Sequence, residues 1–414
     1  MDRRRASHDV PARRGSHAAP SRPRWARRIL AGVGVLVLLI GGGTVVAATV
    51  LKRNITTVDL TPALGTDRPS AAPIDPDGGR AVNFLVMGSD SRAGDNGFVG
   101  GAIDAPKSDT TLLVHLAADR SRAVAVSIPR DSLVDVPSCT DPVTRQTTPG
   151  SRRMFNNAFE TGGPACTLRT VESLTGIRID HWVVVEFNGF KNVVDALGTV
   201  PICLAQPVND DQHNIHLPAG RSEVDGETAL KYVRERYEIG DGSDLGRIDR
   251  QQAFIASVLQ KATSTGTLSN PAKTYAVLRA VTGALTMNPE LSSLTRLAGF
   301  AQAIQHVGLK KIRFLTVPTG PAPDDVNRLV WTDQAEQVWT ALREDRPLET
   351  AADRDTDQDT DQDTDQDGTP SPTRSPSRGA TPGTSSGASA SPSPSGVVLD
   401  GVKVRSADAD ICPS

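Results

Sequence analysis

Three short apolar runs decide the fold of this chain: VNFLVMG (82–88), TTLLVHLA (110–117) and AVAVSIP (123–129). Each is rich in residues that favour β-strands and is bounded by Gly, Pro or polar residues, which is typical of buried strands. Only the five residues 118–122 separate the second run from the third, and 118–121 read as a polar turn. Because so short a turn favours antiparallel pairing, we expect these two strands to be antiparallel neighbours in a sheet.

Helical and strand-like segments alternate along the sequence that follows. Further strands are expected at 181–187 and 311–318, and two short helices, each ended by Gly, at 154–163 and 166–176. Further helices are expected at 190–198, 225–236, 245–262, 272–286, 291–306 and 333–344. Such a mixture predicts an α/β fold with three layers, α-β-α, around a central mixed sheet.

The composition indicates that part of the chain does not pack into a core. The 414 residues include 36 Gly and 29 Pro, and only 38 % are hydrophobic. The 45 basic and 48 acidic residues give a net charge of −3, which argues against a general nucleic-acid-binding protein.

The N-terminal segments predict a membrane protein. Residues 1–28 contain nine Arg and two acidic residues, and we expect a disordered basic tail. The segment 29–51 has no charged residue and is long enough to cross a ~30 Å hydrocarbon core as one transmembrane helix. Because the basic residues gather before this helix, we expect a single-pass cell-membrane protein with a cytoplasmic N-terminus and an extracytoplasmic remainder.

Composition sets the other boundaries. Residues 52–79 are expected to form an extended extracytoplasmic stalk, and residues 80–346 a globular domain. Residues 347–396 combine an acidic DTDQ repeat with a Ser/Pro-rich tract, which predicts a disordered spacer. The short segment 397–414 regains apolar residues and contains Cys412.

Charged residues lie at the ends of the three deciding strands. Asp90 comes just after the first, Asp109 just before the second and Arg130 just after the third. If the three strands are antiparallel neighbours, these residues meet at one edge of the sheet. Two carboxylates there repel each other unless a cation or a proton lies between them, and carboxylate oxygens suit Mg²⁺. The alternative is that Asp90 and Asp109 only cap loops.

A second group of polar residues flanks a Gly-rich loop. Arg234 and Arg236 precede this loop, and Arg247, Arg250 and Gln251 follow it on one face of an expected helix. Arginine guanidinium groups bind phosphate oxygens through paired hydrogen bonds, and a helix N-terminus adds partial positive charge. These residues alone leave two interpretations open: a Mg²⁺-assisted phosphoryl-transfer site and a structural cluster of salt bridges.

Six motifs, in this order, resemble the LytR-CpsA-Psr family of cell-wall enzymes. They are NFLVMGSDSR, KSDTTLLVHL, VSIPRDSLVDVP, FNNAF, AGRSEVDGETALKYVRER and DLGRIDRQQAFI, within residues 82–264. The segment 397–414, with RSADADIC, resembles the end of a small C-terminal module of some members. The resemblance implies that 80–346 is a catalytic domain, a phosphotransferase that moves a glycopolymer from a polyprenyl-pyrophosphate carrier to the 6-hydroxyl of N-acetylmuramic acid in peptidoglycan.

The resemblance also implies roles for single residues. Asp90 and Asp109 match magnesium-binding acids, with Mn²⁺ as a substitute metal, and together with Arg130 they form the expected catalytic group. The pyrophosphate-binding positions are Lys107, Arg130, Arg234, Arg236, Arg247, Arg250 and Gln251. Lys107 stands where we expect Arg, so it keeps the charge but loses the paired hydrogen bonds. A lipid groove is expected at Val183, Val185, Phe187, Phe190 and Val194, for which plain core packing is the alternative.

The four cysteines lie in the part expected outside the membrane, where disulfides form. We expect Cys139 to pair with Cys166 beside the active site, and Cys203 with Cys412, although the sequence permits three pairings.

Two other functions stay open. A pyrophosphatase that releases the lipid-linked sugar phosphate with water needs the same acids and arginines. A non-catalytic envelope regulator that binds cell-wall glycopolymers does not need both acids beside an arginine cluster. The sequence does not name the glycopolymer.

Overall fold

The structure is a computed structural model that describes residues 42–43, 45–75, 79–89, 108–141, 144–211, 214–235, 243–349 and 396–412. The chain divides into two compact units, Met1–Val50 and Leu51–Ser414, and the described residues of the first unit are helical. Within the described ranges, none of the helices combines the length and the apolar character that a membrane crossing requires. The predicted tail 1–28 and most of the predicted span 29–51 lie outside these ranges.

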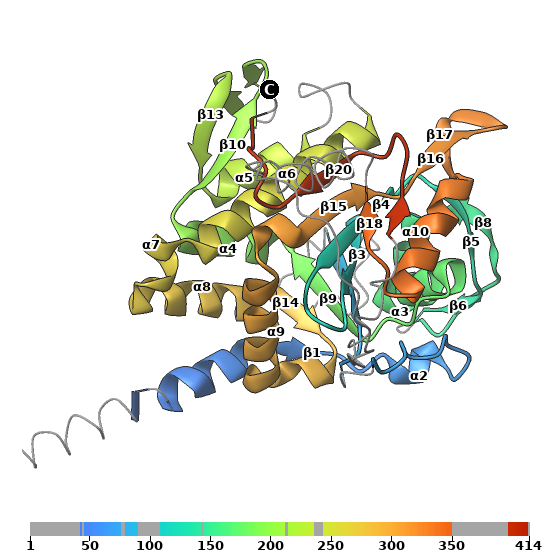
Figure 1. Cartoon of the computed structure of the whole chain (residues 1–414), viewed down its shortest axis with the longest axis horizontal. Helices are drawn as coiled ribbons and strands as arrows, with labels where there is room; N and C mark the ends of the chain where they lie inside the picture. Colours follow the sequence, from blue (N-terminus) through green and yellow to red (C-terminus); the bar gives the residue numbers. More distant parts are fainter. Residues whose placement is uncertain are drawn as a thin grey trace, which may run out of the picture. The chain divides into compact units, whose positions relative to one another are not determined.

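An eight-stranded mixed sheet forms the centre of the second unit (Figure 1), in the order β1-β14-β9-β2-β3-β4-β15-β20. Its strands are β1 (Thr56–Thr57), β2 (Val82–Ser89), β3 (Ser108–Leu116), β4 (Ala123–Ile128), β9 (His181–Glu186), β14 (Leu285–Met287), β15 (Ile312–Thr316) and β20 (Val404–Ser406). β2, β3 and β4 are antiparallel neighbours, whereas β9 joins β2, and β15 joins β4, in parallel. The predicted α/β fold with a central mixed sheet is confirmed.

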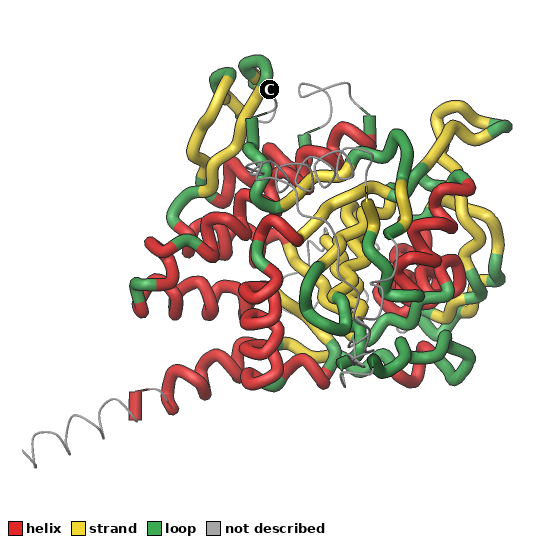
Figure 2. The backbone as a smooth tube through the Cα atoms, in the orientation of Figure 1, coloured by secondary structure: helices red, strands yellow, loops and turns green. Residues whose placement is uncertain are grey.

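Helices cover both faces of this sheet (Figure 2), because successive residues of its strands point to opposite faces. Leu113 of β3 belongs to a buried cluster with residues of α3 (Asn156–Thr175) and α10 (Asp333–Arg343). Its neighbour Leu112 belongs to another cluster, with residues of α6 (Asp244–Thr263) and α9 (Leu294–Val307). A third cluster joins α4 (Phe187–Leu197), α5 (Gly226–Arg234) and α6.

Shorter elements complete the unit. The remaining helices are α2 (Thr61–Leu64), α7 (Thr265–Leu268), α8 (Pro271–Ala284) and two 3-10 turns, Pro289–Ser292 and Leu309–Lys311. Strand pairs outside the main sheet, in the described part of the chain, are β5 (Leu133–Val136) with β8 (Ser151–Met154), β6 (Cys139–Thr140) with β7 (Thr147–Thr148), β10 (Val200–Leu204) with β13 (Gly220–Val224), β11 (Val208–Asp210) with β12 (Ile215–Leu217), β16 (Thr319–Ala322) with β17 (Asp325–Trp331), and β18 (Leu348–Glu349) with β19 (Val397–Val398).

The two short helices expected at 154–163 and 166–176 form one element, α3, with a break between them. Gly162 and Gly163 have non-helical backbone angles, and Gly163 has a φ of 59°. Gly176 ends the second part with a φ of 63°, a conformation that glycine adopts without steric cost. The predicted glycine stops are therefore confirmed.

The prediction of a separate extended stalk at 52–79 is wrong for most of its length. β1 pairs in parallel with β14, and Leu60 and Leu64 are buried in the cluster that contains α3. Arg68 forms a salt bridge of 2.6 Å with the buried carboxylate of Glu172 in α3. The apolar side chains of this short segment have a core to join, so it becomes part of the domain.

The C-terminal segment is a part of the same sheet rather than a separate module. β20 pairs antiparallel with β15, and β19 pairs with β18. The residues of β18 were predicted to belong to the spacer. Leu399, Ala407 and Ile411 are buried. This segment is therefore part of the domain, held by strand pairing and by burial of its apolar side chains. Residues 350–395 of the predicted spacer lie outside the described residues.

Both predicted disulfides are present. Cys139 pairs with Cys166, joining β6 to α3 across 27 residues, and Cys203 pairs with Cys412, joining β10 to the C-terminal segment across 209 residues. Cross-links over loops of these lengths remove chain entropy from the unfolded state, by about 4 and 5 kcal/mol respectively in the simplest treatment.

Candidate active site

Asp109 lies in an irregularity of β3. The Cα partner of Gly88 is Thr110, but that of Ser89 is Ser108, so Asp109 has no residue opposite it on β2. A bulge of this kind bends the strand and redirects the side chain of the extra residue, and bulges occur often beside active sites. The local fold therefore sets Asp109 apart at the end of the sheet.

Arg130 follows β4 at the same end of the sheet. Thr111 pairs with Ile128, and continuing that register by two residues places Arg130 opposite Asp109. Arg130 Nη1 donates a hydrogen bond of 2.6 Å to Asp109 Oδ1, and both side chains are largely buried, with 14 % and 20 % exposed. The predicted meeting of these two residues at one sheet edge is confirmed.

The N-terminus of α6 enters the same cluster. Ser243 caps the helix by accepting a hydrogen bond from the Gly246 N–H. In the first turn, Asp244 Oδ1 accepts a hydrogen bond from Arg247 Nη2 and lies 3.4 Å from Arg130 Nε. Arg247 Nη2 also lies 3.5 Å from the carbonyl oxygen of Asp109. Two arginines and two aspartates from β3, the end of β4 and α6 thus form one buried ionic cluster.

The next residues of α6 connect this cluster to α5. Gln251 Oε1 accepts a hydrogen bond of 3.0 Å from Thr110 Oγ1, and its Nε2 donates one of 3.3 Å to the Val233 carbonyl. Arg250 donates to the carbonyl oxygen of Glu235, just after α5. The predicted face formed by 247, 250 and 251 is therefore turned toward the strand end and toward α5.

Arg234 lies at the C-terminal end of α5 and contacts an aromatic ring. Its guanidinium carbon is 4.4 Å from the centre of the Phe187 ring, at the start of α4. Such a contact holds an arginine in place while leaving its N–H groups directed sideways. Asp90, Lys107 and Arg236, the other predicted site residues, lie outside the described residues.

Sequence reasoning missed Asp244 as a site residue. It treated the start of α6 only as a source of partial positive charge, whereas the Asp244 carboxylate lies between Arg130 and Arg247. The available signal was the spacing of Asp244 and Arg247, because residues three apart on a helix face the same side.

The carboxylates of this site could hold a hard cation such as Mg²⁺ only together with other ligands. Among the residues that the structure describes, no group of three or more His, Cys, Asp or Glu could hold a metal ion. Mg²⁺ is commonly held by one or two carboxylates together with water and substrate phosphates. Asp109 fits such a site with Asp90 as the expected second acid, whereas a closed protein cage of the zinc type does not fit the described part of the chain.

The sheet face beside α6 and α9 is incompletely covered at its centre. Phe84 and Val86 of β2 are only half-buried, although strands flank β2 on both sides. On β9, Trp182 and Val184 are buried in the α3 cluster, so the half-buried Val183 and Val185 point to the opposite face. Phe300 of α9 stacks edge-on against Phe84, with ring centres 4.8 Å apart. Partly exposed apolar side chains therefore gather between the sheet and α9.

The other predicted groove residues are placed differently. Phe187 carries Arg234 on its ring, and Phe190 is half-buried with its ring centre 5.4 Å from that of Phe254. Val194 is only 1 % exposed inside the cluster of α4, α5 and α6, where it has no surface to offer a ligand. Core packing, the alternative interpretation, therefore holds for Val194.

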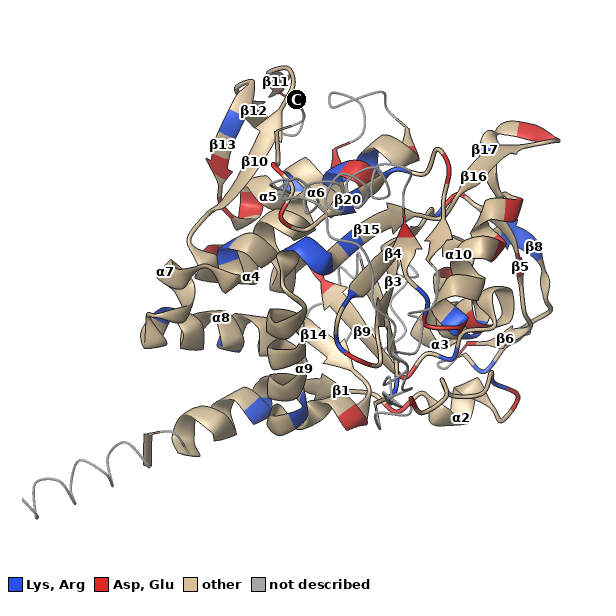
Figure 3. Cartoon of the chain, viewed as in Figure 1, with Lys and Arg blue, Asp and Glu red and all other residues tan. Residues whose placement is uncertain are grey.

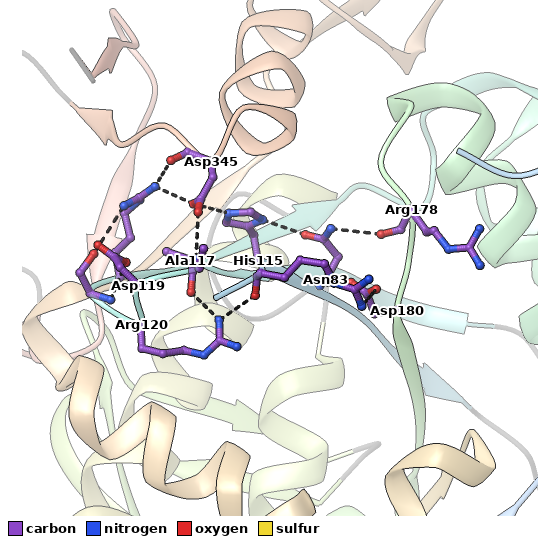
Figure 4. A network of polar contacts seen from close by, with 12 residues as sticks. Asn83, His115, Ala117, Asp119, Arg120, Arg178, Asp180 and Asp345 are labelled. Atoms are coloured by element: carbon purple, nitrogen blue, oxygen red, sulfur yellow. Dashed lines mark hydrogen bonds and ion pairs between the residues drawn. The ribbon is translucent and has the colours of Figure 1, made fainter. Parts of the chain in front are cut away.

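A separate polar network lies at the other end of β3 (Figure 4). His115 is buried between the Asn83 Oδ1 atom, 2.8 Å from its Nδ1, and the Asp345 Oδ1 atom, 3.0 Å from its Nε2. Asp345 also accepts hydrogen bonds from Arg122 and from the Ala118 N–H. Because His115 is six residues from Asp109 on the same strand, this network ties the sheet to the end of α10, away from the ionic cluster.

Comparison with known proteins identifies relatives of the whole domain. The LytR_cpsA_psr family profile matches residues 47–344. LcpB of Corynebacterium glutamicum, a probable cell wall biosynthesis protein, is 34 % identical over 333 residues, which covers 78 % of this chain and 72 % of the relative. A protein of Oceanobacillus iheyensis, named polyisoprenyl-teichoic acid–peptidoglycan teichoic acid transferase TagU, is 28 % identical over 288 residues, 67 % of this chain and 81 % of that protein.

A solved structure shares the fold. The LytR-Csp2A-Psr enzyme from Actinomyces oris superposes with a TM-score of 0.53 at 18 % identity, covering 70 % of this chain and 95 % of the other. At this identity the likeness concerns the fold alone.

Proposed function

The chain belongs to the LytR-CpsA-Psr family, and on that premise we propose that it is a membrane-anchored phosphotransferase that moves a glycopolymer from a polyprenyl-pyrophosphate carrier to peptidoglycan. The observation that carries the proposal is the ionic cluster of Asp109, Arg130, Asp244 and Arg247 at one end of the sheet. The relative named as a polyisoprenyl-teichoic acid–peptidoglycan transferase supports the same class of reaction.

The cluster suits the binding of a pyrophosphate. Arg130 approaches from a strand end and Arg247 from a helix, so the two guanidinium groups come from different sides. Each is held by a carboxylate before any substrate arrives. Donors fixed in this way need little reorganisation when negative charge develops during the reaction. Such preorganised donors are the main source of electrostatic catalysis. Gln251 contacts Thr110, the residue after Asp109, and Arg250 lies one residue before Gln251 on the same helix.

In the proposed reaction, a sugar hydroxyl of peptidoglycan attacks the phosphorus that carries the glycopolymer. A new oxygen–phosphorus bond forms, the bond from that phosphorus to the bridging oxygen breaks, and polyprenyl phosphate leaves with the electron pair. The hydroxyl proton goes to a carboxylate. Asp109, Asp131 and Asp244 each form an ion pair with Arg130, and the sequence adds Asp90 as an expected acid. Positioning of the two reactants is the second contribution that the arginines make.

We assign the metal to Asp109 and Asp90, with Mg²⁺ or Mn²⁺ as the ion. When bound, such an ion supplies positive charge to the pyrophosphate oxygens. Arg130 already pairs with Asp109 in the structure, so ion and arginine together would offset most of the negative charge of the two acids and the pyrophosphate.

The half-buried apolar side chains between the sheet and α9 support a lipid-linked donor. Phe84, Val86, Val183 and Val185 lie on β2 and β9, and β2 is the neighbour of β3, which carries Asp109. Covering them with a polyprenyl chain would remove apolar surface from water, worth roughly 25 cal/mol for each Å².

The test uses full-length protein in detergent with a radiolabelled polyprenyl-pyrophosphate oligosaccharide, with and without peptidoglycan. A transferase makes labelled peptidoglycan and needs the acceptor for turnover. Equal release of sugar phosphate with and without peptidoglycan would instead show a pyrophosphatase. Binding of the donor without any turnover would show a non-catalytic regulator.

A further inference from the structure

The C-terminal segment 396–412 lies outside the residues that the family profile matches, yet it forms one wall of a pocket that Arg250 of α6 also lines. The pocket has a volume of about 280 Å³. Residues of α5, α6, β10 and the C-terminal segment line it, among them Tyr232, Asp249, Arg250, Phe254, Arg405 and Ile411. Figure 3 marks basic and acidic residues along α6 and in the neighbouring β20.

Several contacts fix this wall in place. Gln260 of α6 donates hydrogen bonds of 2.7 and 3.3 Å to the carbonyl oxygens of Ala407 and Ala409. Arg405 pairs with Phe314 in the register of β20 and β15. The disulfide between Cys203 and Cys412 ties the segment to β10, and Cys203 itself lines the pocket. The wall is therefore held covalently on one side and by the sheet on the other.

The lining combines an apolar floor with basic groups. Tyr232, Phe254 and Ile411 are almost fully buried. Burial raises the pKa of Tyr232 and outweighs the opposite effect of Arg250 and Arg405, so the hydroxyl stays protonated at neutral pH and can donate a hydrogen bond. Asp249, which also lines the pocket, contributes one carboxylate and lies 3.6 Å from Lys403.

Arg405 has hydrogen-bonding capacity left in this pocket. Its Nη2 donates to the Asp410 carbonyl at 2.6 Å. A guanidinium group carries five N–H donors, so the Arg405 side chain, which lines the pocket, has donors left for an acceptor atom of a bound ligand.

We propose that this pocket binds one anionic sugar unit of the substrate, next to the pyrophosphate. This rests on the proposed function and adds a subsite to it. A volume near the lower end of the ligand-pocket range, roughly 300–1,000 Å³, admits a single ring rather than a chain. Aromatic and apolar walls suit the ring, whereas Arg250 and Arg405 suit a phosphate or carboxylate on it. Arg250 follows Arg247 by one turn of α6, which joins the pocket to the ionic cluster.

The anionic sugar has two sources, the first unit of the donor glycan and the muramic acid of the acceptor. The binding test therefore uses two probes with full-length protein in a calorimeter: N-acetylglucosamine 1-phosphate for the donor and N-acetylmuramic acid for the acceptor. Neutral N-acetylglucosamine serves as the reference. Arg405→Ala should weaken binding of one anionic probe by about 10-fold, as expected for the loss of one charge-assisted hydrogen bond, and should leave the weak binding of the neutral sugar unchanged.

Arg152→Ala is the control for charge removal. Arg152 is exposed on β8 and does not line the pocket, so binding should not change. Arg405→Gln removes the charge but keeps the first three side-chain carbons and a polar end, and it replaces the alanine variant if that variant unfolds on a thermal scan. Wild-type affinity of the folded Arg405 variant for both anionic probes overturns the proposal.

The same binding test in the Arg130→Ala variant distinguishes a failure of this proposal from a failure of the proposed function. In Arg130→Ala, where the pyrophosphate site is damaged, binding of the anionic probe should persist and should still depend on Arg405. If transfer activity survives in Arg130→Ala while the effect of Arg405 on binding is observed, the proposed mechanism fails and the pocket stands. If only Arg130→Ala abolishes binding, the probe occupies the pyrophosphate site and the pocket proposal is wrong.

Discussion

Arg130 and Asp109 meet across 2.6 Å although 20 residues separate them in the sequence, because one follows β4 and the other sits in a bulge of β3. The contact joins two of the motifs that carry the family resemblance. It also means that the acid expected to bind the metal is already paired with a cation in the protein alone. Binding of a charged substrate must therefore redistribute these ionic contacts.

Removing either central arginine should nearly abolish turnover. Loss of one fixed donor from a buried charge-stabilising site costs about 2–4 kcal/mol in the transition state, which is about 30- to 1,000-fold in rate. We expect this loss for Arg130→Ala and for Arg247→Ala in the transfer of labelled donor to peptidoglycan.

Arg152→Ala is the control for charge removal, because Arg152 is exposed on β8. Circular dichroism checks that each variant is folded. Folded Arg130→Ala and Arg247→Ala variants that match the wild type in rate would refute the role of the cluster in binding pyrophosphate.

Activity should depend on a divalent cation. The motivation is Asp109 at the sheet end together with Asp90 in the adjacent motif. Excess chelator should stop transfer, and Mg²⁺ or Mn²⁺ should restore it; Asp109→Asn should raise the metal concentration needed for half-maximal rate by at least about tenfold, since one charged ligand is lost. Full activity in chelator would rule out the metal site.

Asp345→Asn should destabilise the domain at neutral pH. Burial alone would raise the pKa of Asp345, but hydrogen bonds from His115 and the Ala118 N–H, together with the charge of Arg122, hold it below its ordinary value of 3.8. A depressed pKa in the folded state adds stability above the unfolded-state pKa, and this stability is lost as the pH falls toward the folded-state pKa. Asparagine tolerates the positive φ of 51° at this position, so the substitution tests the charge.

Urea unfolding of the wild type and of Asp345→Asn between pH 7 and pH 3 measures the difference in free energy of unfolding. We expect about 2 kcal/mol at pH 7, shrinking as the pH drops below 4. Glu344→Gln, which changes an exposed neighbouring acid, should show little difference at any pH. A difference for Asp345→Asn that stays constant down to pH 3 would contradict the charge-based explanation.

The segment after the predicted membrane span should be extracytoplasmic, because nine arginines precede that span. All four native cysteines are in disulfides, so Ser70→Cys introduces one free thiol at an exposed position. In intact cells it should react with a reagent that does not cross membranes. Labelling only after the cells are broken would reverse the topology.

Local patterns were enough to predict most elements of the sheet and several site contacts. β2, β3 and β4 are apolar runs with clear ends, and the strand-end positions of Asp109 and Arg130 followed from antiparallel pairing alone. The contact of Asp244 with Arg130 could not be predicted in the same way, because it depends on where α6 enters relative to β4. That position is set by tertiary packing, which periodicity does not encode.

The boundaries of the domain were predicted less well for a related reason. Thr56–Thr57 and Val404–Ser406 are too short to show a strand period, and each becomes a strand only because a longer strand offers it a free edge. Leu60 and Leu64 likewise gain their burial from α3, which lies about a hundred residues further along the chain. Composition assigned the N-terminal segment to a stalk and left the C-terminal one as a short segment apart from the domain.

The Cys203–Cys412 bond and the pairing of β20 with β15 have a consequence for a protein exposed to proteases. A single cut anywhere between residues 349 and 396 would produce two polypeptides that remain joined by the disulfide and by the sheet. Such a nicked molecule would migrate as one species without reductant and as two with it. The pocket wall that carries Arg405 would stay in place after the cut, so the intact spacer is not needed to hold it there.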